Sequence, residues 1–403
     1  MGNRNYFDYV VLLFIWGTAT SGLVKYVGLV IGFPYVHLMP KGILLVAALI
    51  PLLLSKFSRR QFAVLIFLSL WGAYSVHRNG VPQTLMGFWV LLPFFFGMMF
   101  PTVVLSEVVK RGLLYVFLVS LAFELINYLT PFPWESMVID YGDYSSTVGR
   151  AWTDNGARRL AGLSSSSIDL SLVLALSSLF MASRIRSSAW KVVIVSLSFF
   201  AIYLTTMKTA AAAYLLAAVP LIWGRRPVRI SWFWGAVFAT LAGTLLPVYV
   251  YSEPDAARAL VDGFLTLQAR LHVVWPAVID YTLRSSPGLL GLGMGGLGAA
   301  MQVGGQAMPY GFVDNMYLYV VACGGLLGVA FIFLLWRALH RLCTRNAADY
   351  SLAGGGALVF IVIYGVTQVS FEASMSSLFL GALVGGHAFS RKERQLKLGV
   401  SPQ

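Results

Sequence analysis

Twelve apolar runs divide this sequence, and each is long enough to cross roughly 30 Å of lipid as a helix. They start near Phe7, Lys41, Gln61, Gln83, Gly112, Asp169, Lys191, Thr209, Ser231, Asp314, Ser351 and Ser374. Apolar residues make up 58% of the chain and charged residues 11%, a balance far from that of soluble domains. The sequence therefore predicts an all-α polytopic membrane protein with about twelve transmembrane helices. Residues 1–403 form one transmembrane domain, and the first helix is expected to remain as an anchor rather than be cleaved.

Basic residues gather at every second connection between these runs, which indicates the cytoplasmic side. The cytoplasmic segments carry Arg4, Lys56-Arg59-Arg60, Lys110-Arg111, Arg184-Arg186-Lys191, Arg225-Arg226-Arg229, Arg337-Arg341-Arg345 and Arg391-Lys392-Arg394-Lys397. This pattern predicts that both termini are cytoplasmic. Two outer connections are long, residues 131–168 and residues 252–313. The second lies between the ninth and tenth helices and is expected to be partly helical.

The helical expectation for residues 252–313 rests on a start signal and a spacing. Ser252-Glu253-Pro254-Asp255 has the residue types of a helix N-terminus. Apolar residues then recur at steps of three and four, which is typical of an amphipathic helix. They are Ala257, Leu260, Phe264, Leu267 and Leu271.

Ten basic residues lie on the predicted outer side, where topology disfavours them. They are Lys25, Lys41, Arg78, Arg150, Arg158, Arg159, Lys208, Arg258, Arg270 and Arg284. The first three lie near helix ends and are interpreted as anchors that reach the membrane surface. The arginines of the long loops suggest phosphate binding. The alternative is pairing with local acids such as Asp140, Asp143, Asp154 and Asp262. Lys208 lies in a tight hairpin, where burial near the membrane surface favours an anionic partner, although contact with lipid headgroups is the alternative.

Polar residues precede the tenth apolar run in "MPYGFVDNMYLYVVACGGLLG", Met308 to Gly328. Asp314 is either the N-cap of that helix or a general base or sugar ligand, and Asn315 would orient the same substrate. Glu372 and His272 are secondary candidates. No set of residues suggests a metal site.

A glycine-rich stretch and two cysteines complete the candidate features. "GLGMGG", Gly291 to Gly296, matches a dinucleotide pattern only formally, because no strand precedes it. Its expected role is a flexible, closely approaching backbone whose N–H groups could help hold an anion. Cys323 and Cys343 indicate neither a disulfide framework nor a zinc site.

Four stretches of the chain resemble the O-antigen polymerase and O-antigen ligase superfamily of bacterial inner-membrane glycosyltransferases. They are "RRLAGLSSSSIDLSLVLAL", "YLTTMKTAAAAYLL", "ARLHVVWPAVIDYTLRSSPGLLGLGMGG" and "VDNMYLYVVACGGLLG", in this order over roughly residues 150–330. Two positions depart from the family pattern. Lys208 stands where the family usually has Ser-Arg, and Asp314 replaces the histidine of ligases. The first 130 residues show no such likeness.

The resemblance implies a GT-C-like fold and a reaction at the periplasmic face. The donor would be a glycan on undecaprenyl pyrophosphate, which is substrate rather than cofactor, and transfer would be inverting and metal-independent. The lipid tails would lie between helices. Fixed cations would stabilise the departing pyrophosphate.

The residue patterns described above and the resemblance together suggest roles for single residues. Asp314, Arg270 and Lys208 are the expected catalytic residues. The expected substrate-binding residues are Arg159, Arg158, Asn315, Tyr317, His272, Arg284 and Glu372.

A polymerase of O-antigen, capsular or exopolysaccharide repeat units is the leading interpretation. Its partners would be the lipid-linked donor and acceptor, membrane lipids and a chain-length regulator, with no nucleic acid. An O-antigen ligase that transfers the glycan to lipid A core is the first alternative. A twelve-helix transporter is the alternative from another class, with Lys25 and Glu124 as intramembrane ionisable groups. A purely structural subunit would leave the outward cations unexplained.

Overall fold

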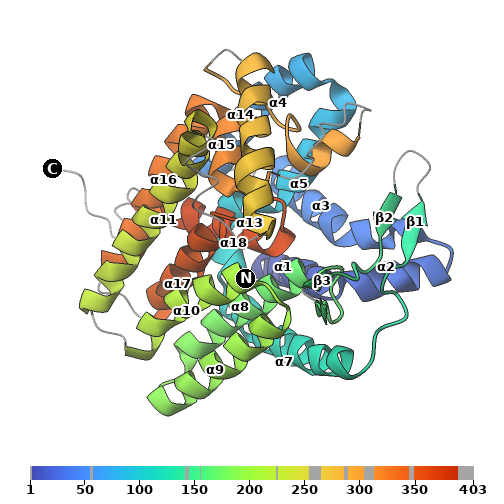
Figure 1. Ribbon diagram of the computed structural model, residues 1–403, viewed down its shortest axis with the longest axis vertical. Helices are drawn as coiled ribbons and strands as arrows, with labels where there is room; N and C mark the ends of the chain where they lie inside the picture. The colour runs from blue at the N-terminus through green and yellow to red at the C-terminus, as the bar shows by residue number, and fades with distance from the viewer. Residues whose placement is uncertain are drawn as a thin grey trace.

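The computed structural model describes residues 2–54, 58–140, 145–154, 156–223, 226–253, 265–285, 289–303, 313–344 and 349–388, which form a helical bundle (Figure 1). The α-helices are α1 Gly2–Ala19, α2 Ser21–Val30, α3 Met39–Leu53, α4 Arg59–Asn79, α5 Val81–Met99, α6 Pro101–Val104, α7 Glu107–Leu129, α8 Ser167–Arg184, α9 Ser188–Leu204, α10 Lys208–Trp223, α11 Arg226–Ser252, α13 Leu265–Ala269, α14 Trp275–Ser285, α15 Met316–Gly324, α16 Leu326–Thr344, α17 Asp349–Tyr364 and α18 Ser374–Ala388. Shorter helical turns are η1 Pro34–Leu38, the π-helix η2 Arg270–Val274 and η3 Gly298–Gln302.

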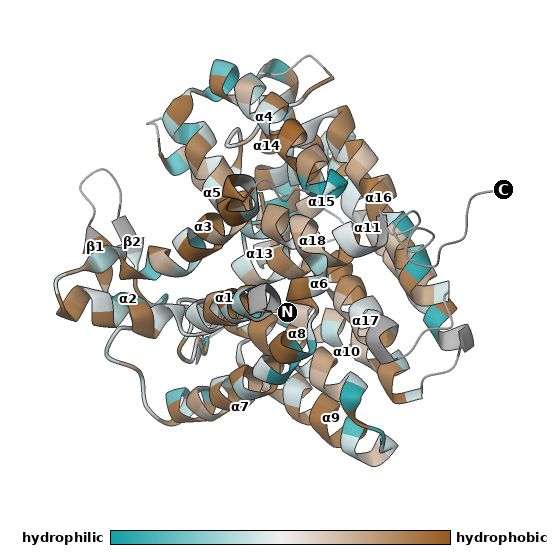
Figure 2. Ribbon diagram, turned by 180° about the vertical axis from the view of Figure 1, so that it is seen from behind, coloured by the Kyte–Doolittle hydropathy of each residue, from teal (hydrophilic) through white to brown (hydrophobic). Residues whose placement is uncertain are grey.

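Each of the twelve predicted apolar runs contains a helix, and apolar residues cover most of the length of these helices (Figure 2). Six helical segments are long and apolar enough to cross a membrane, and the pair α1–α2, bent by 81°, makes a possible seventh. The six are Pro34–Pro51, Val81–Met99, Glu107–Leu129, Ser167–Arg184, Arg229–Ser252 and Leu326–Thr344. Helices α9, α10, α17 and α18 are apolar but shorter. The chain is a helical membrane protein.

Helices α5 and α18 pack closely enough that only glycine fits at their contact. A Cβ atom on Gly97 would collide with the carbonyl oxygen of Leu378, and one on Gly381 would collide with that of Phe94. Small residues allow such close backbone approach, which is a common source of helix association in membranes.

The first long connection contains two antiparallel hairpins that the all-α prediction did not include. Strands β1 Val138–Asp140 and β2 Ser145–Thr147 pair, as do β3 Thr153–Asp154 and β4 Ala157–Arg158. The turn of the second hairpin includes Gly156 at φ 80°, a backbone conformation that glycine adopts without strain. The strands are too short for an alternating apolar pattern to be recognised in the sequence.

The second long connection is partly helical where it is described, as expected, through α13, η2, α14 and η3. Ser252 is the last residue of α11, and its hydroxyl donates to Tyr249 O at 2.9 Å. Several residues named in the sequence analysis lie outside the described residues: Pro254, Asp255, Ala257, Arg258, Leu260, Asp262 and Phe264, and Asp143 in the first connection. The side chains of Asp140 and Asp154 are likewise not described.

Connections predicted to share a side contact one another. Gly22 N donates to Leu163 O at 2.9 Å, and Met316 N donates to Gly365 O at 2.7 Å. At the opposite end, Arg184 Nη2 lies 3.2 Å from Glu107 Oε2. We call the end with the two long connections the loop end.

Candidate functional site

An arginine and an aspartate far apart in sequence meet at the loop end. Arg270 Nε donates to Asp314 Oδ2 at 3.1 Å, and the two side chains are 18% and 31% exposed. Arg270 begins the π-helix η2, a geometry often found at functional sites. Trp275 Nε1 donates to Val313 O at 3.1 Å and so fixes α14 beside the residues that precede α15. The pair is therefore rigidly placed and accessible.

Asn315, not Asp314, is the N-cap of α15, so the capping interpretation of Asp314 is wrong. The Asn315 side chain accepts from Tyr317 N and Leu318 N, both at 2.9 Å, and donates to Gly243 O at 2.9 Å. Asp314 has φ 47°, a left-handed conformation that aspartate and asparagine tolerate better than most residues. Because Asn315 makes the cap, the Asp314 carboxylate is available to Arg270.

Asn315 and Tyr317 use their polar atoms within the protein. Asn315 is fully buried, and the buried Tyr317 hydroxyl donates to Val362 O at 2.6 Å. In this structure both residues position Asp314 by fixing the start of α15.

Further charged side chains interact electrostatically with the Arg270–Asp314 pair or with one another. Glu372, in the segment between α17 and α18, accepts from Ala299 N at 2.8 Å. Burial raises the pKa of Glu372 to about 7; the Ala299 hydrogen bond and the charge of Lys41 oppose this, and the charge of Asp314 adds to it. The charges of Asp169 and Glu372 both act on the Lys41 ammonium. We call Arg270, Asp314, Glu372, Lys41 and Asp169 the charge cluster.

Lys41 and Asp169 are the members of the charge cluster that sequence analysis missed as site residues. Lys41 was interpreted as a membrane anchor, and Asp169 only marked the start of a helix. Ser166 is the N-cap of α8, and its hydroxyl donates to Asp169 Oδ2 at 2.7 Å. The spacing Ser-x-x-Asp was a visible signal for this cap. No local signal could have shown that three distant elements bring Lys41, Asp169 and Glu372 together.

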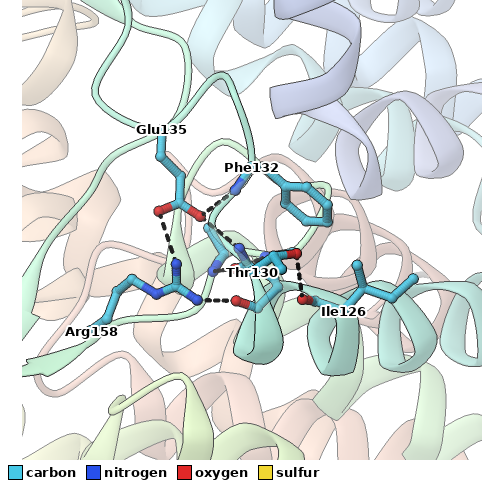
Figure 3. Close-up of polar contacts among 8 residues, drawn as sticks. Ile126, Thr130, Phe132, Glu135 and Arg158 are labelled. Atoms are coloured by element: carbon cyan, nitrogen blue, oxygen red, sulfur yellow. Dashed lines mark hydrogen bonds and ion pairs between the residues drawn. The ribbon is translucent and has the colours of Figure 1, made fainter.

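Arg158 and Arg284 pair with nearby carboxylates, so the local-pairing alternative holds for these two arginines, but their partners are Glu135 and Asp280 and not the aspartates named in the sequence analysis. Arg158 Nη1 lies 3.6 Å from Glu135 Oε2, and Arg158 also donates to the backbone oxygen of Asn127 (Figure 3). This contact braces the first long connection against the end of α7. Arg284 Nε donates to Asp280 Oδ1 at 2.9 Å within α14, and its side chain is 80% exposed. Neither arginine belongs to the charge cluster.

The remaining predicted residues lie at several places around the loop end. Lys208 is exposed at the first residue of α10, in the tight hairpin that the sequence predicts. His272 is half-buried in η2, and its Nε2 is buried without a hydrogen-bond partner among the described residues. Arg159 is half-buried beside Trp152. The transporter alternative named Glu124 and Lys25. Glu124 is fully buried in α7, whereas Lys25 Nζ donates to Thr147 O at 3.0 Å.

The glycine-rich stretch is buried between helices. Several of its N–H groups form hydrogen bonds within the protein, so the prediction that they hold an anion is wrong for these groups. Residues 291–298 are buried. Leu292 N and Gly293 N donate to Ala322 O and Cys323 O, and Met294 N donates to Ser75 Oγ. The stretch therefore joins α4 to α15 through its backbone.

An apolar cavity of about 310 Å³ lies between α4, α5, α15 and α16. Its lining includes Trp71, Phe94, Tyr319, Phe331 and Phe371. It adjoins the charge cluster, because Phe371 precedes Glu372 and the charge of Glu372 acts on Tyr319. An apolar cavity beside a charged group suits an amphiphilic ligand.

Within the described part of the chain, no group of three or more histidine, cysteine, aspartate or glutamate side chains could hold a metal ion. No protein-family model, curated protein or solved structure matches the chain. The resemblance to the polymerase and ligase superfamily therefore rests on the four sequence stretches themselves.

Proposed function

We propose that this chain is a glycosyltransferase of the bacterial inner membrane that joins oligosaccharide repeat units carried on undecaprenyl pyrophosphate. The product would be an O-antigen, capsular or exopolysaccharide. The observation that carries the proposal is that Glu372 of the charge cluster directly follows Phe371, which lines an apolar cavity. A lipid-linked pyrophosphate has both parts of the matching ligand, an apolar chain and an anionic head.

The proposed topology has twelve spans, a GT-C-like arrangement, both termini in the cytoplasm and the loop end in the periplasm. It requires α4 and the shorter helices α9, α10, α17 and α18 to cross as well. The contacts that gather the predicted outer connections at one end support this topology. A chain-length regulator is the proposed protein partner.

Arg270 would stabilise the charge that develops on the departing pyrophosphate. Its guanidinium has five N–H donors, of which the pair with Asp314 uses Nε, and arginine binds phosphate bidentately through such donors. Preorganised cations of this kind lower the barrier because they need no rearrangement during the reaction. Lys208 would add a second positive charge from the hairpin between α9 and α10.

Asp314 would accept the proton of the acceptor hydroxyl as that oxygen attacks the anomeric carbon. The bond from the anomeric carbon to the pyrophosphate oxygen breaks, and the configuration inverts. The ion pair with Arg270 orients the carboxylate, and the cap made by Asn315 holds its backbone. General-base catalysis of this kind contributes about 100-fold or more.

Substitutions that remove the charge of each member of the Arg270–Asp314 pair test the proposal. Arg270→Gln and Asp314→Asn keep size and polarity but remove charge, and Asn tolerates the left-handed backbone of residue 314. In membrane vesicles supplied with lipid-linked repeat units, we expect each to lower polymer formation about 100-fold at matched protein levels. Arg186→Gln is the matched control, because Arg186 is an exposed arginine on the predicted cytoplasmic side, and it should retain wild-type output.

Other outcomes identify the alternatives. Wild-type polymer from both variants would refute the assignment of the site. Glycan attached to lipid A core with unchanged chain length would indicate a ligase. Movement of a substrate across sealed vesicles without a new glycosidic bond would indicate a transporter.

A further inference from the structure

Two guanidinium groups share one indole in the first long connection. Arg150 Cζ lies 4.9 Å and Arg159 Cζ 5.7 Å from the centroid of the Trp152 ring. Both distances fall within the range of cation–π attraction. Arg159 Nε is buried and has no hydrogen-bond acceptor among the described residues. The indole thus holds two positive charges near each other, one of them with an unused donor.

A third cation joins them from another element. Lys25, on α2, donates to Thr147 O at 3.0 Å, and the charge of Arg150 acts on its ammonium. We call Arg150, Arg159 and Lys25 the basic group. Guanidinium and ammonium groups gathered in this way favour an oxyanion as ligand, because charge-assisted hydrogen bonds to such a group are strong.

The backbone holds the basic group in place before any ligand binds. Arg159 N donates to Trp152 O at 2.8 Å, and Arg150 N donates to Ser165 O at 3.0 Å. The contact of Gly22 N with Leu163 O ties α2 to the same segment. A site fixed in this way loses little entropy when a ligand binds.

Asp169 lies beside the basic group, because Ser165 donates to Asp169 Oδ2 at 3.2 Å through its hydroxyl and accepts from Arg150 N at 3.0 Å through its backbone oxygen. The charge of Asp169 also acts on Lys41 of the charge cluster. A molecule that reacts beside Arg270 and Asp314 could therefore extend past Asp169 to Trp152. In the proposed function, the part of the substrate that extends away from the reacting end is glycan.

We propose that the basic group binds the acidic substituent, a carboxylate or phosphate, of a charged sugar residue in the glycan. The assignment of the oxyanion to a saccharide rests on the proposed function. The site would make the transferase selective for acidic repeat units. Paired guanidinium groups suit this ligand, because they match the planar oxygens of a carboxylate.

Binding without turnover tests the proposal. The full chain in lipid nanodiscs would be titrated with a hexuronate-containing oligosaccharide and with the same oligosaccharide after its carboxyl is reduced to an alcohol. Wild-type protein should bind the acidic form about 10-fold tighter or more. The double variant Arg150→Gln and Arg159→Gln should bind both forms equally, whereas Arg186→Gln, at an exposed arginine of the predicted cytoplasmic side, should keep the preference.

Two further measurements keep the result interpretable. The double variant Arg150→Lys and Arg159→Lys keeps the charge and should retain part of the preference, which separates loss of the site from loss of folding. Nanodiscs of neutral and of anionic phospholipid would show whether headgroups occupy the site instead. Equal binding of both oligosaccharides by wild type, an unchanged preference in the Gln variant, or loss of acid binding only in anionic lipid would overturn the proposal.

The outcome is separable from that of the polymerisation assay. An inactive protein that still prefers the acidic oligosaccharide would refute the proposed function and leave the basic group as a saccharide site. An active protein that binds both oligosaccharides equally would support the proposed function and refute the basic group as a saccharide site.

Discussion

Two roles that the sequence suggested for Asp314, helix capping and a place in the site, belong to two neighbouring residues, Asn315 and Asp314. Asn315 makes the cap of α15 through two backbone N–H groups. Asp314 adopts the left-handed region at φ 47° and meets Arg270. Residue types at a helix start indicate that a cap exists, but the choice between adjacent candidates depends on backbone angles that tertiary contacts impose. The contact of Met316 N with Gly365 O is one such constraint.

Glu372 should make stability depend on pH. Its folded pKa of about 7 lies above its ordinary value of 4.5, so between these values the folded protein binds more protons than the unfolded chain. The free energy of unfolding should therefore fall as pH rises through this window and level off above it. Glu372→Gln keeps an acceptor for Ala299 N and should remove that slope, leaving the variant more stable than wild type above about pH 7.

Thermal unfolding in detergent from about pH 5 to about pH 8 measures this effect. Glu253→Gln changes an exposed carboxyl instead and should keep the wild-type profile. If Glu372→Gln also kept the wild-type slope, the neutral form of Glu372 would not contribute to stability.

At the scale of elements, the glycine-rich stretch acts through backbone packing. Gly295 lies at φ 80°, and a Cβ there would collide with Gln83 O at the start of α5. Gly80 has φ 79° but open space around it. Gly72 is helical, and its nearest neighbour would be Met294 Cε at 3.6 Å. The three glycines therefore differ in which constraint applies.

Alanine substitution at these glycines should give a graded loss of stability. Gly72→Ala should be neutral or stabilising by about 0.5–1 kcal/mol, because alanine favours helices. Gly80→Ala should cost about 1–2 kcal/mol through backbone strain alone. Gly295→Ala should cost more than Gly80→Ala, since steric overlap adds to strain. Thermal unfolding of the three variants in one detergent measures the order, and equal stability of Gly80→Ala and Gly295→Ala would contradict the close packing.

The same element shows the limit of a motif. "GLGMGG" predicted close backbone approach, and the structure confirms this. The sequence also predicted a flexible backbone whose N–H groups help hold an anion. In the structure, the N–H groups of Leu292, Gly293 and Met294 donate to α15 and α4 instead. Glycine content indicates which conformations the backbone can adopt. The hydrogen-bond partners are set by the tertiary fold, which brings Ala322, Cys323 and the distant Ser75 to this stretch.

At the scale of the whole molecule, sequence predicted the helices well and the site only in part. Hydropathy and the distribution of basic residues are local signals, so the twelve helical runs follow from them. The pair of Arg270 and Asp314 was chosen residue by residue, but their mutual contact was not. Lys41 was missed because a lysine at a helix start has the same local appearance as an anchor or as a site residue. The two hairpins were missed because their strands are only two or three residues long.

The proposed twelve-span topology places adjacent connections on opposite sides of the membrane, and the short helix α9 is its most demanding step. Arg186 and Lys208 flank that helix, and both are exposed. Cys323 and Cys343 are buried, so their replacement by alanine gives a background for single cysteines. In intact cells, a membrane-impermeant maleimide should label Lys208→Cys and Arg284→Cys. It should label Arg186→Cys only after the membrane is opened. Labelling of Arg186→Cys and Lys208→Cys from the same side would mean that α9 does not cross, and Lys208 would then lie on the cytoplasmic side, away from Arg270 and Asp314.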